Sequence, residues 1–108
     1  MSTLDRRAER LTARFADEAD VSVGTGFGSS QGLRVKGKIF AIFGADELVL
    51  KLPKARVDQL VDAGTGTRFD PRRNGRVMKE WVVVPSQHSR RWGSLADEAL
   101  AFVRAGAR

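Results

Sequence analysis

Basic side chains are concentrated in one stretch of this sequence, residues 64–92. The stretch carries seven lysine and arginine residues against two acidic ones, so it holds +5 of the chain's net charge of +6. Asn74 and Gly75 predict a tight hairpin turn, because both residue types tolerate positive φ. We expect the hairpin tip to carry Arg72, Arg73 and Arg76, and the segment after the hairpin to carry Arg90 and Arg91. Guanidinium groups suit phosphate oxygens, so this hairpin is expected to contact a nucleic-acid backbone as a wing.

A second basic group consists of Arg34, Lys36 and Lys38. A strand predicted over residues 34–43 would place these three side chains on one face, since side chains alternate along a strand. Binding through both groups would release counterions, so affinity for duplex DNA is expected to fall with salt at a log–log slope of about −0.9 per contact. The partner predicted for these eight residues is DNA or another polyanion, bound without sequence-specific readout.

The residues that catalysis or metal binding would need are scarce. His88 is the single histidine, and the chain has neither cysteine nor tyrosine. One imidazole without other soft ligands makes a poor transition-metal site, and no serine lies in a nucleophile-elbow context. The glycines within residues 22–32 match neither the dinucleotide fingerprint nor the Walker pattern. We therefore predict a non-enzymatic protein with no catalytic residues, no metal and no cofactor.

Cysteine content and hydropathy indicate the expected cellular location of the protein and whether it has a membrane partner. A chain without cysteine fits a reducing cytoplasm, and we expect a cytoplasmic location. The apolar runs, such as residues 81–84, are all far shorter than the ~20 residues that a transmembrane helix needs. No membrane partner is therefore expected.

Each of the two tryptophans has two interpretations. Trp81 lies in an apolar strand pattern, where a core position is favoured over a ligand platform. Trp92 follows Arg90 and Arg91, and it could stack on a base while the arginines hold phosphate. Its alternative role is to close the end of the core beside the last helix.

The order of elements predicts a single domain over residues 1–108. A helix is predicted from Ser2 to about residue 19, with a mixed-charge, solvated face that includes Arg7 and Arg10. Strands follow over 34–43 and 47–52, and Gly37 marks either a bulge or a split of the first run into two shorter strands. The glycine-rich residues 22–32 are interpreted as a loop or a strand edge. A short helix is expected between Pro53 and Gly64, then the second hairpin, then a helix from about Ser94 to Gly106. The predicted fold is an α+β, two-layer domain with an antiparallel sheet in the order α-β(3)-α-β(2)-α.

Four segments resemble the YjbR/MmcQ-like family and the related N-terminal domain of the competence regulator TfoX (Sxy). They are residues 37–42 (GKIFAI), 47–53 (ELVLKLP), 69–71 (FDP) and 75–85 (GRVMKEWVVVP). The resemblance covers residues 34–105 and departs from the family pattern at the glycines 24–32. It implies the same α-β(3)-α-β(2)-α order, similar to type III secretion chaperones. It also implies a "double wing" DNA-binding role, a label that rests on fold analogy.

The sequence therefore leaves two alternative functions open. The first is DNA or polyanion binding through the basic hairpin. The alternative is a protein-interaction or chaperone-like homodimeric module without nucleic-acid binding, which predicts an uncharged apolar patch on the surface. The distribution of the basic side chains in space separates them, because they either merge into one face or scatter.

Overall fold

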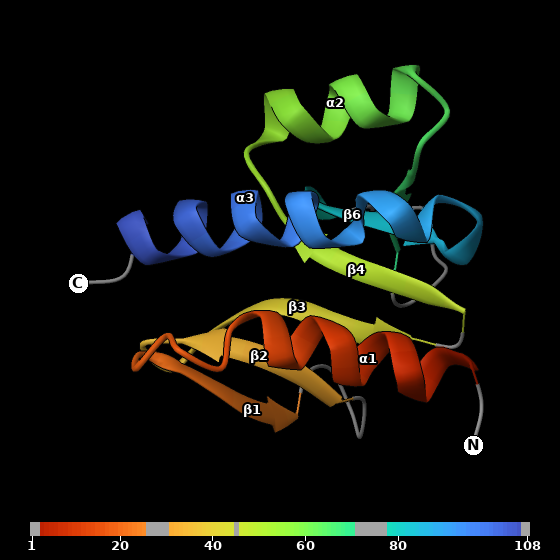
Figure 1. Cartoon of the computed structure of the whole chain (residues 1–108). Helices are drawn as coiled ribbons and strands as arrows, with labels where there is room; N and C mark the ends of the chain where they lie inside the picture. Colours follow the sequence, from red (N-terminus) through yellow and green to blue (C-terminus); the bar gives the residue numbers. More distant parts are fainter. Residues whose placement is uncertain (1–2, 26–30, 45, 71–77, 107–108) are drawn as a thin grey trace.

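Six strands form one antiparallel sheet, and α-helices cover one of its faces (Figure 1). The computed structural model describes residues 3–25, 31–44, 46–70 and 78–106. Their elements are α1 (Thr3–Arg14), β1 (Val21–Thr25), β2 (Gln31–Val35), β3 (Lys38–Gly44), β4 (Glu47–Lys51), α2 (Lys54–Asp62), β5 (Thr67–Phe69), β6 (Met78–Pro85), the 3₁₀ helix η1 (Ser86–Arg91) and α3 (Trp92–Gly106).

The strands lie in the order β1-β2-β3-β4-β6-β5, and every neighbouring pair is antiparallel. The α+β class and the antiparallel sheet are therefore confirmed, with four strands before α2 where the predicted order has three. The additional strand comes from two sources. The glycine-rich segment supplies β1 and the start of β2, and the run expected as one strand over 34–43 is divided in two.

The division occurs at Lys36 and Gly37, which form a two-residue turn between β2 and β3. Their φ angles are +52° and +81°, the pair of positive values that a type I′ hairpin turn requires. Beyond the turn, Arg34 pairs with Ile39 and Leu33 pairs with Ala41, so Phe40 is an extra residue in β3. This bulge places Phe40 and Ala41 together in the helix-side core, where Phe40 packs edge-on against Phe15 with ring centroids 5.6 Å apart.

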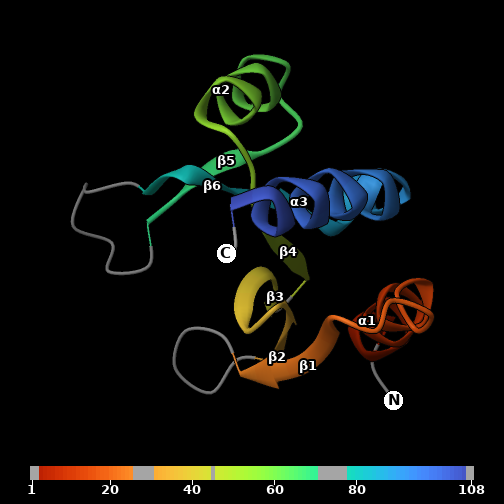
Figure 2. The same cartoon turned by 90° about the vertical axis from the view of Figure 1, so that its left-hand side faces the viewer.

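Helices α1 and α3 lie on the same side of the sheet (Figure 2), and α2 packs on the same side over β6 and β5. The main core lies between these layers. β4 contributes Leu48 and Leu50, and the following Leu52 joins them, as the alternation of the sequence predicts. A smaller apolar cluster of Ile42, Val49 and Trp81 lies on the opposite face of the sheet. Trp81 is 5% exposed, so its predicted burial is confirmed.

The ends of α2 match the sequence prediction, whereas the start of α3 does not. Pro53 is the N-cap of α2, and Gly64, at φ +76°, ends it in a Schellman motif, in which the Thr65 N–H donates to the Leu60 carbonyl. The last helix was expected to start near Ser94. It begins at Trp92 instead, and Ser94 Oγ donates back to the Arg91 carbonyl at 3.2 Å. Helix α1 is also shorter than predicted, ending at Arg14.

Among the described residues, no helix is both long and apolar enough to cross a bilayer.

Candidate functional site

Three arginines of α1 lie on one face of the helix. Arg7, Arg10 and Arg14 are three and four residues apart, the spacing that stacks side chains along a single face. The apolar Leu11 and Phe15 lie beside them on the face that enters the core. Sequence analysis assigns Arg7 and Arg10 to a solvated, mixed-charge face. The structure shows Arg10 exposed, as predicted, and places this face opposite η1 and the start of α3.

Trp92 attaches that second wall to the sheet. Its ring is 3% exposed, and its Nε1–H donates to the Val84 carbonyl of β6 at 3.2 Å. The core interpretation of Trp92 is therefore confirmed, and its ring is too deeply buried to stack on a base. Because β6 runs directly into η1, the anchored tryptophan fixes Ser89 and Arg90 against α1.

The two walls enclose a cleft with a volume of about 280 Å³. We call it the arginine cleft; its lining includes Arg7, Arg10, Arg14, Ser89, Arg90 and Trp92. Gly93 forms part of the wall, and a Cβ at this position would lie 3.0 Å from Arg14 Nη1. The glycine thus lets the Arg14 guanidinium lie close against the first turn of α3.

Carboxylates neutralise two of the four guanidinium groups. Arg14 donates from Nε and Nη2 to the two oxygens of Asp97, at 3.0 and 2.6 Å. The hydrogen bond to Asp97, followed by the charge of that carboxylate, raises the pKa of Arg14 above its ordinary value. Arg7 lies 5.9 Å above the Trp92 ring and 3.8 Å from the carboxylate of Asp46. Among the described residues, neither Arg10 nor Arg90 has an acidic partner, so the cleft keeps a local charge of +2.

The predicted basic residues that the structure describes do not gather at one place. Arg72, Arg73 and Arg76 lie outside the described residues. Arg90 lines the arginine cleft, but its neighbour Arg91 points away and donates from Nη1 to Thr65 Oγ1, beyond the end of α2. Of the five predicted residues that the structure describes, only Arg90 lines this cleft.

The prediction that Arg34, Lys36 and Lys38 share one face of a strand is wrong. Lys36 occupies the β2–β3 turn and Lys38 begins β3, so only Arg34 lies within β2. Arg34 lies across Gly24 of β1 and donates from Nη1 to the Gly37 carbonyl at 3.1 Å. Gly37 splits the run into two strands, which is one of the two outcomes the sequence predicts for it, and the chain reverses there.

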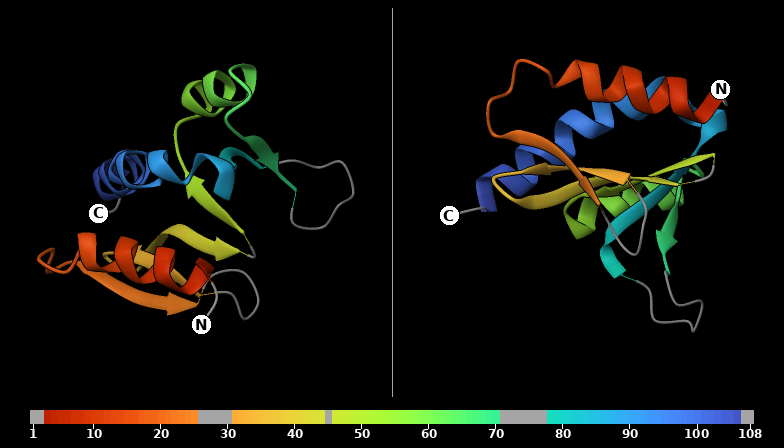
Figure 3. Two further views of the ribbon diagram at one scale, coloured as in Figure 1. Left: turned by 45° about the vertical axis from the view of Figure 1, so that its right-hand side comes forward. Right: turned by 90° about the horizontal axis from the view of Figure 1, so that it is seen from below.

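The β2–β3 turn lies toward the C-terminal end of α3, whereas η1, which lines the arginine cleft, precedes its N-terminal end (Figures 1 and 3). Arg104, near the C-terminal end of α3, donates to Asp20, whose backbone carbonyl accepts the Lys36 N–H at 2.9 Å. Arg90 directly precedes the N-terminal end of the same helix. A helix of 15 residues spans about 20 Å. The two basic groups are therefore separate features of the surface.

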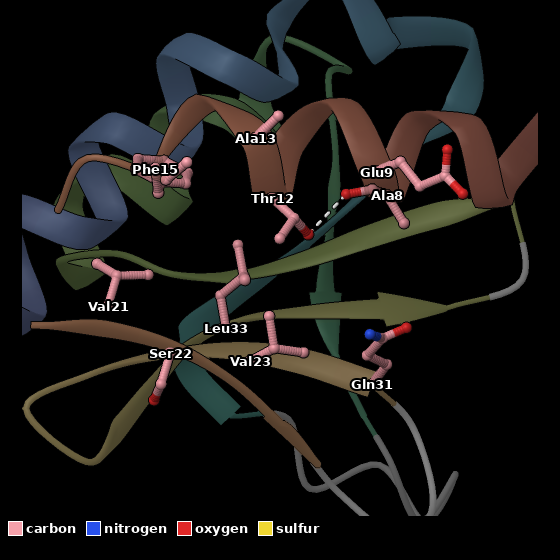
Figure 4. A pocket seen from close by; sticks show the side chains of 11 residues that line it. Ala8, Glu9, Thr12, Ala13, Phe15, Val21, Ser22, Val23, Gln31 and Leu33 are labelled. Carbon is pink, nitrogen blue, oxygen red and sulfur yellow. Dashed lines mark hydrogen bonds between the residues drawn. The ribbon is translucent and has the colours of Figure 1, made fainter. Parts of the chain in front are cut away.

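On the other side of α1 lies a larger, apolar groove with a volume of about 650 Å³ (Figure 4). We call it the β1 groove. Ala8, Thr12 and Ala13 line it from α1, Val21 and Val23 from β1, and Leu33 from β2. Among the described residues that line the groove, Glu9 alone is charged. The homodimeric alternative predicts an uncharged apolar patch; this groove combines apolar and polar side chains and carries one charge.

Groups that could bind a metal are not assembled in the described part of the chain. No set of three or more His, Asp or Glu side chains lies close enough to hold an ion there. His88 is half-buried in η1, with its Nε2 3.3 Å from Gln87 Nε2.

Comparison of the chain with protein-family models, curated proteins and solved structures finds no match.

Proposed function

We propose that this domain is a non-enzymatic protein that binds DNA or another polyanion, with the arginine cleft as a principal contact. The observation that carries the proposal is the local charge of +2 formed by four arginines from two elements around one cleft. Arg10 and Arg90 have no acidic partner among the described residues, so phosphate oxygens can replace water on both guanidinium groups. The resemblance to the YjbR/MmcQ-like family agrees with this function, and the lack of cysteine agrees with a cytoplasmic location.

The chemistry of the cleft favours contact with the nucleic-acid backbone over contact with bases. Trp92 is buried, which removes the aromatic platform that single-strand binders use. What remains is charge, and phosphate contacts position a protein without carrying sequence information. We therefore expect binding that differs little between sequences and weakens strongly with salt.

The test is a fluorescence anisotropy titration of a labelled duplex and a labelled single strand, at about 50 mM and about 200 mM salt. In the double variant Arg10→Ala/Arg90→Ala, we expect weaker binding and a log–log salt slope shallower by about 1.8 on duplex, because two phosphate contacts are lost. Lys36→Ala/Lys38→Ala is the matched control. It removes the same charge from two exposed residues at the other end of α3, so it is expected to change the slope less. A wild-type chain that binds neither probe at the lower salt would overturn the proposal.

The predicted hairpin is tested in the same assay. Arg72→Ala/Arg73→Ala/Arg76→Ala removes three guanidinium groups, and we expect it to make the salt slope shallower if the hairpin contacts phosphate as well. A slope that changes only in the hairpin variant, and not in Arg10→Ala/Arg90→Ala, would exclude the arginine cleft and assign binding to the hairpin.

A second candidate function is a homodimeric protein-interaction or chaperone-like module that does not bind nucleic acid. The specific observation in its favour is the β1 groove, which is apolar and carries one charged side chain among the described residues that line it. This candidate predicts a mass twice that of the 11.9 kDa chain in light scattering. It also predicts no binding to either nucleic-acid probe.

A further inference from the structure

Strand β1 is the end of the sheet, and its outer edge is open in the part of the chain that the structure describes. No described strand pairs with that edge. Edge strands are usually protected by charges, by proline or by being very short. The opposite edge strand, β5, has both shortness and charge: it spans three residues and carries Arg68, which is paired with Asp58. The five residues of β1 include no charged residue and no proline.

The centre of β1 also exposes an apolar side chain. Val23 is 51% exposed and is the single large hydrophobic residue exposed in the described part of the chain. Figure 4 shows Val23 and Leu33 directed toward α1, whereas Ser22 is directed the other way. Val23 therefore lies where the open edge of the sheet meets the β1 groove. A partner at this edge could form main-chain hydrogen bonds and bury apolar surface at the same time.

Charge restricts the surface through which a second copy could dock. Two copies of a chain with a net charge of +6 repel each other, so they can approach only through a surface that is nearly free of charge. The groove meets this condition, with Glu9 as its one charged residue among those described. The basic groups are elsewhere: the arginine cleft shares no lining residue with the groove, and it lies on the opposite side of α1. A second copy also supplies an identical uncharged strand.

We propose that β1 pairs antiparallel with β1 of a second copy of this chain, about a two-fold axis that passes near Val23. Such an axis makes the contact self-complementary and closed, as symmetric dimers require. It brings Val23 against the partner's Val23, beside the open side of each groove, and joins the two sheets edge to edge. This inference deepens the homodimeric candidate function, and it differs from that candidate in leaving both arginine clefts free to bind a polyanion.

The size of the contact sets the expected strength of the dimer. A strand of five residues with one apolar groove corresponds to the lower end of specific interfaces, below roughly 1,200 Å² in total. We therefore expect a dimer that dissociates at concentrations on the order of micromolar. Salt should strengthen it, because screening reduces the repulsion between the two +6 chains. Nucleic-acid binding has the opposite salt dependence.

The test is sedimentation equilibrium of the full chain without nucleic acid, over a concentration series that crosses the micromolar range, at about 50 mM and about 200 mM salt. The average mass is expected to rise from 11.9 kDa toward twice that value, and to do so at lower protein concentration in the higher salt. Val23→Lys should stay monomeric, because it places two like charges in contact at the axis. Val23 is half exposed, so the substitution is expected to leave the urea midpoint of the monomer almost unchanged.

Two cross-controls separate this proposal from polyanion binding. Arg10→Ala/Arg90→Ala should dimerise at least as well as wild type, and Val23→Lys should bind a short oligonucleotide as wild type does. A chain that stays monomeric at every concentration would overturn the proposal. A dimer that survives Val23→Lys would also overturn it, since the interface would then lie elsewhere.

Discussion

Neighbouring residues of α1 line two different surface features on opposite sides of the helix. Arg7, Arg10 and Arg14 face the arginine cleft, whereas Ala8, Thr12 and Ala13 face the β1 groove. Because a helix turns by about 100° per residue, adjacent positions face different surroundings. Charge and apolar surface can therefore coexist on one helix without interfering. The same alternation made the arginines hard to recognise in the sequence, where they are interleaved with acidic and apolar residues.

Single ion pairs connect segments that are far apart in the chain. Arg104 of α3 donates from Nε and Nη2 to the two oxygens of Asp20, at 2.9 and 2.7 Å, in the segment that leads into β1. The hydrogen bond from Arg104 is the main reason that the pKa of Asp20 lies below its ordinary value. The folded state therefore binds a proton at Asp20 less readily than the unfolded chain does. The pair stabilises the fold at neutral pH.

This pair predicts how acid affects stability. Since the pKa of Asp20 is depressed in the folded state, its contribution is complete above the unfolded value of about 3.9 and is lost as pH falls through the folded value. Asp20→Asn should thus have a lower urea midpoint than wild type at neutral pH, and the difference should shrink below about pH 4. Asp58, whose pKa is also lowered, is present in both proteins and cancels in the comparison. An equal difference in midpoint at neutral and acid pH would contradict this account.

At the scale of elements, the pairing of β2 with β3 depends on a glycine. A Cβ on Gly32 would lie 2.6 Å from the Ala41 carbonyl oxygen and 2.9 Å from Ile39 Cδ1. The carbonyl belongs to the neighbouring strand and cannot move without disturbing the strand pairing. The requirement for glycine at this position thus comes from the close approach of two strands.

We therefore expect Gly32→Ala to destabilise the protein by about 1–3 kcal/mol, the usual cost of overpacking. Gly106→Ala is the control, because a Cβ there meets no atom within 4 Å. Urea denaturation followed by tryptophan fluorescence measures both, since Trp81 and Trp92 are both buried. Equal midpoints for Gly32→Ala and wild type would indicate that β2 and β3 can separate enough to accept the methyl group.

At the scale of the whole molecule, polyanion binding should be visible in thermal stability. A ligand that binds only the folded state raises the free energy of unfolding, by about 2.7 kcal/mol at a concentration of 100 Kd. Wild type should therefore melt at a higher temperature with a saturating oligonucleotide at low salt. Arg10→Ala/Arg90→Ala should show a smaller rise. A wild-type melting temperature that does not respond to the oligonucleotide would count against the proposed function.

The order of the three α-helices, the alternation of β4 and both ends of α2 could be predicted because they depend on residues close together in the sequence. Leu48 and Leu50 follow a period of two, and Gly64 supplies the positive φ that ends a helix. The extra strand before α2 was harder to predict. It depends on Gly37 closing a hairpin, a choice between a turn and a bulge that local pattern leaves open.

Charge segmentation along the chain selected Arg90, which lines the arginine cleft, but it did not identify the cleft itself. The cleft exists because Trp92 anchors η1 to β6 and because Arg14 pairs with Asp97, 83 residues away. Neither contact leaves a periodic signal, since periodicity records which face of an element is buried and not which element lies opposite. The amino-acid sequence by itself therefore determined the class of fold and the excess of positive charge. Tertiary packing decided which arginines share a cleft, because only folding brings α1 and the start of α3 together.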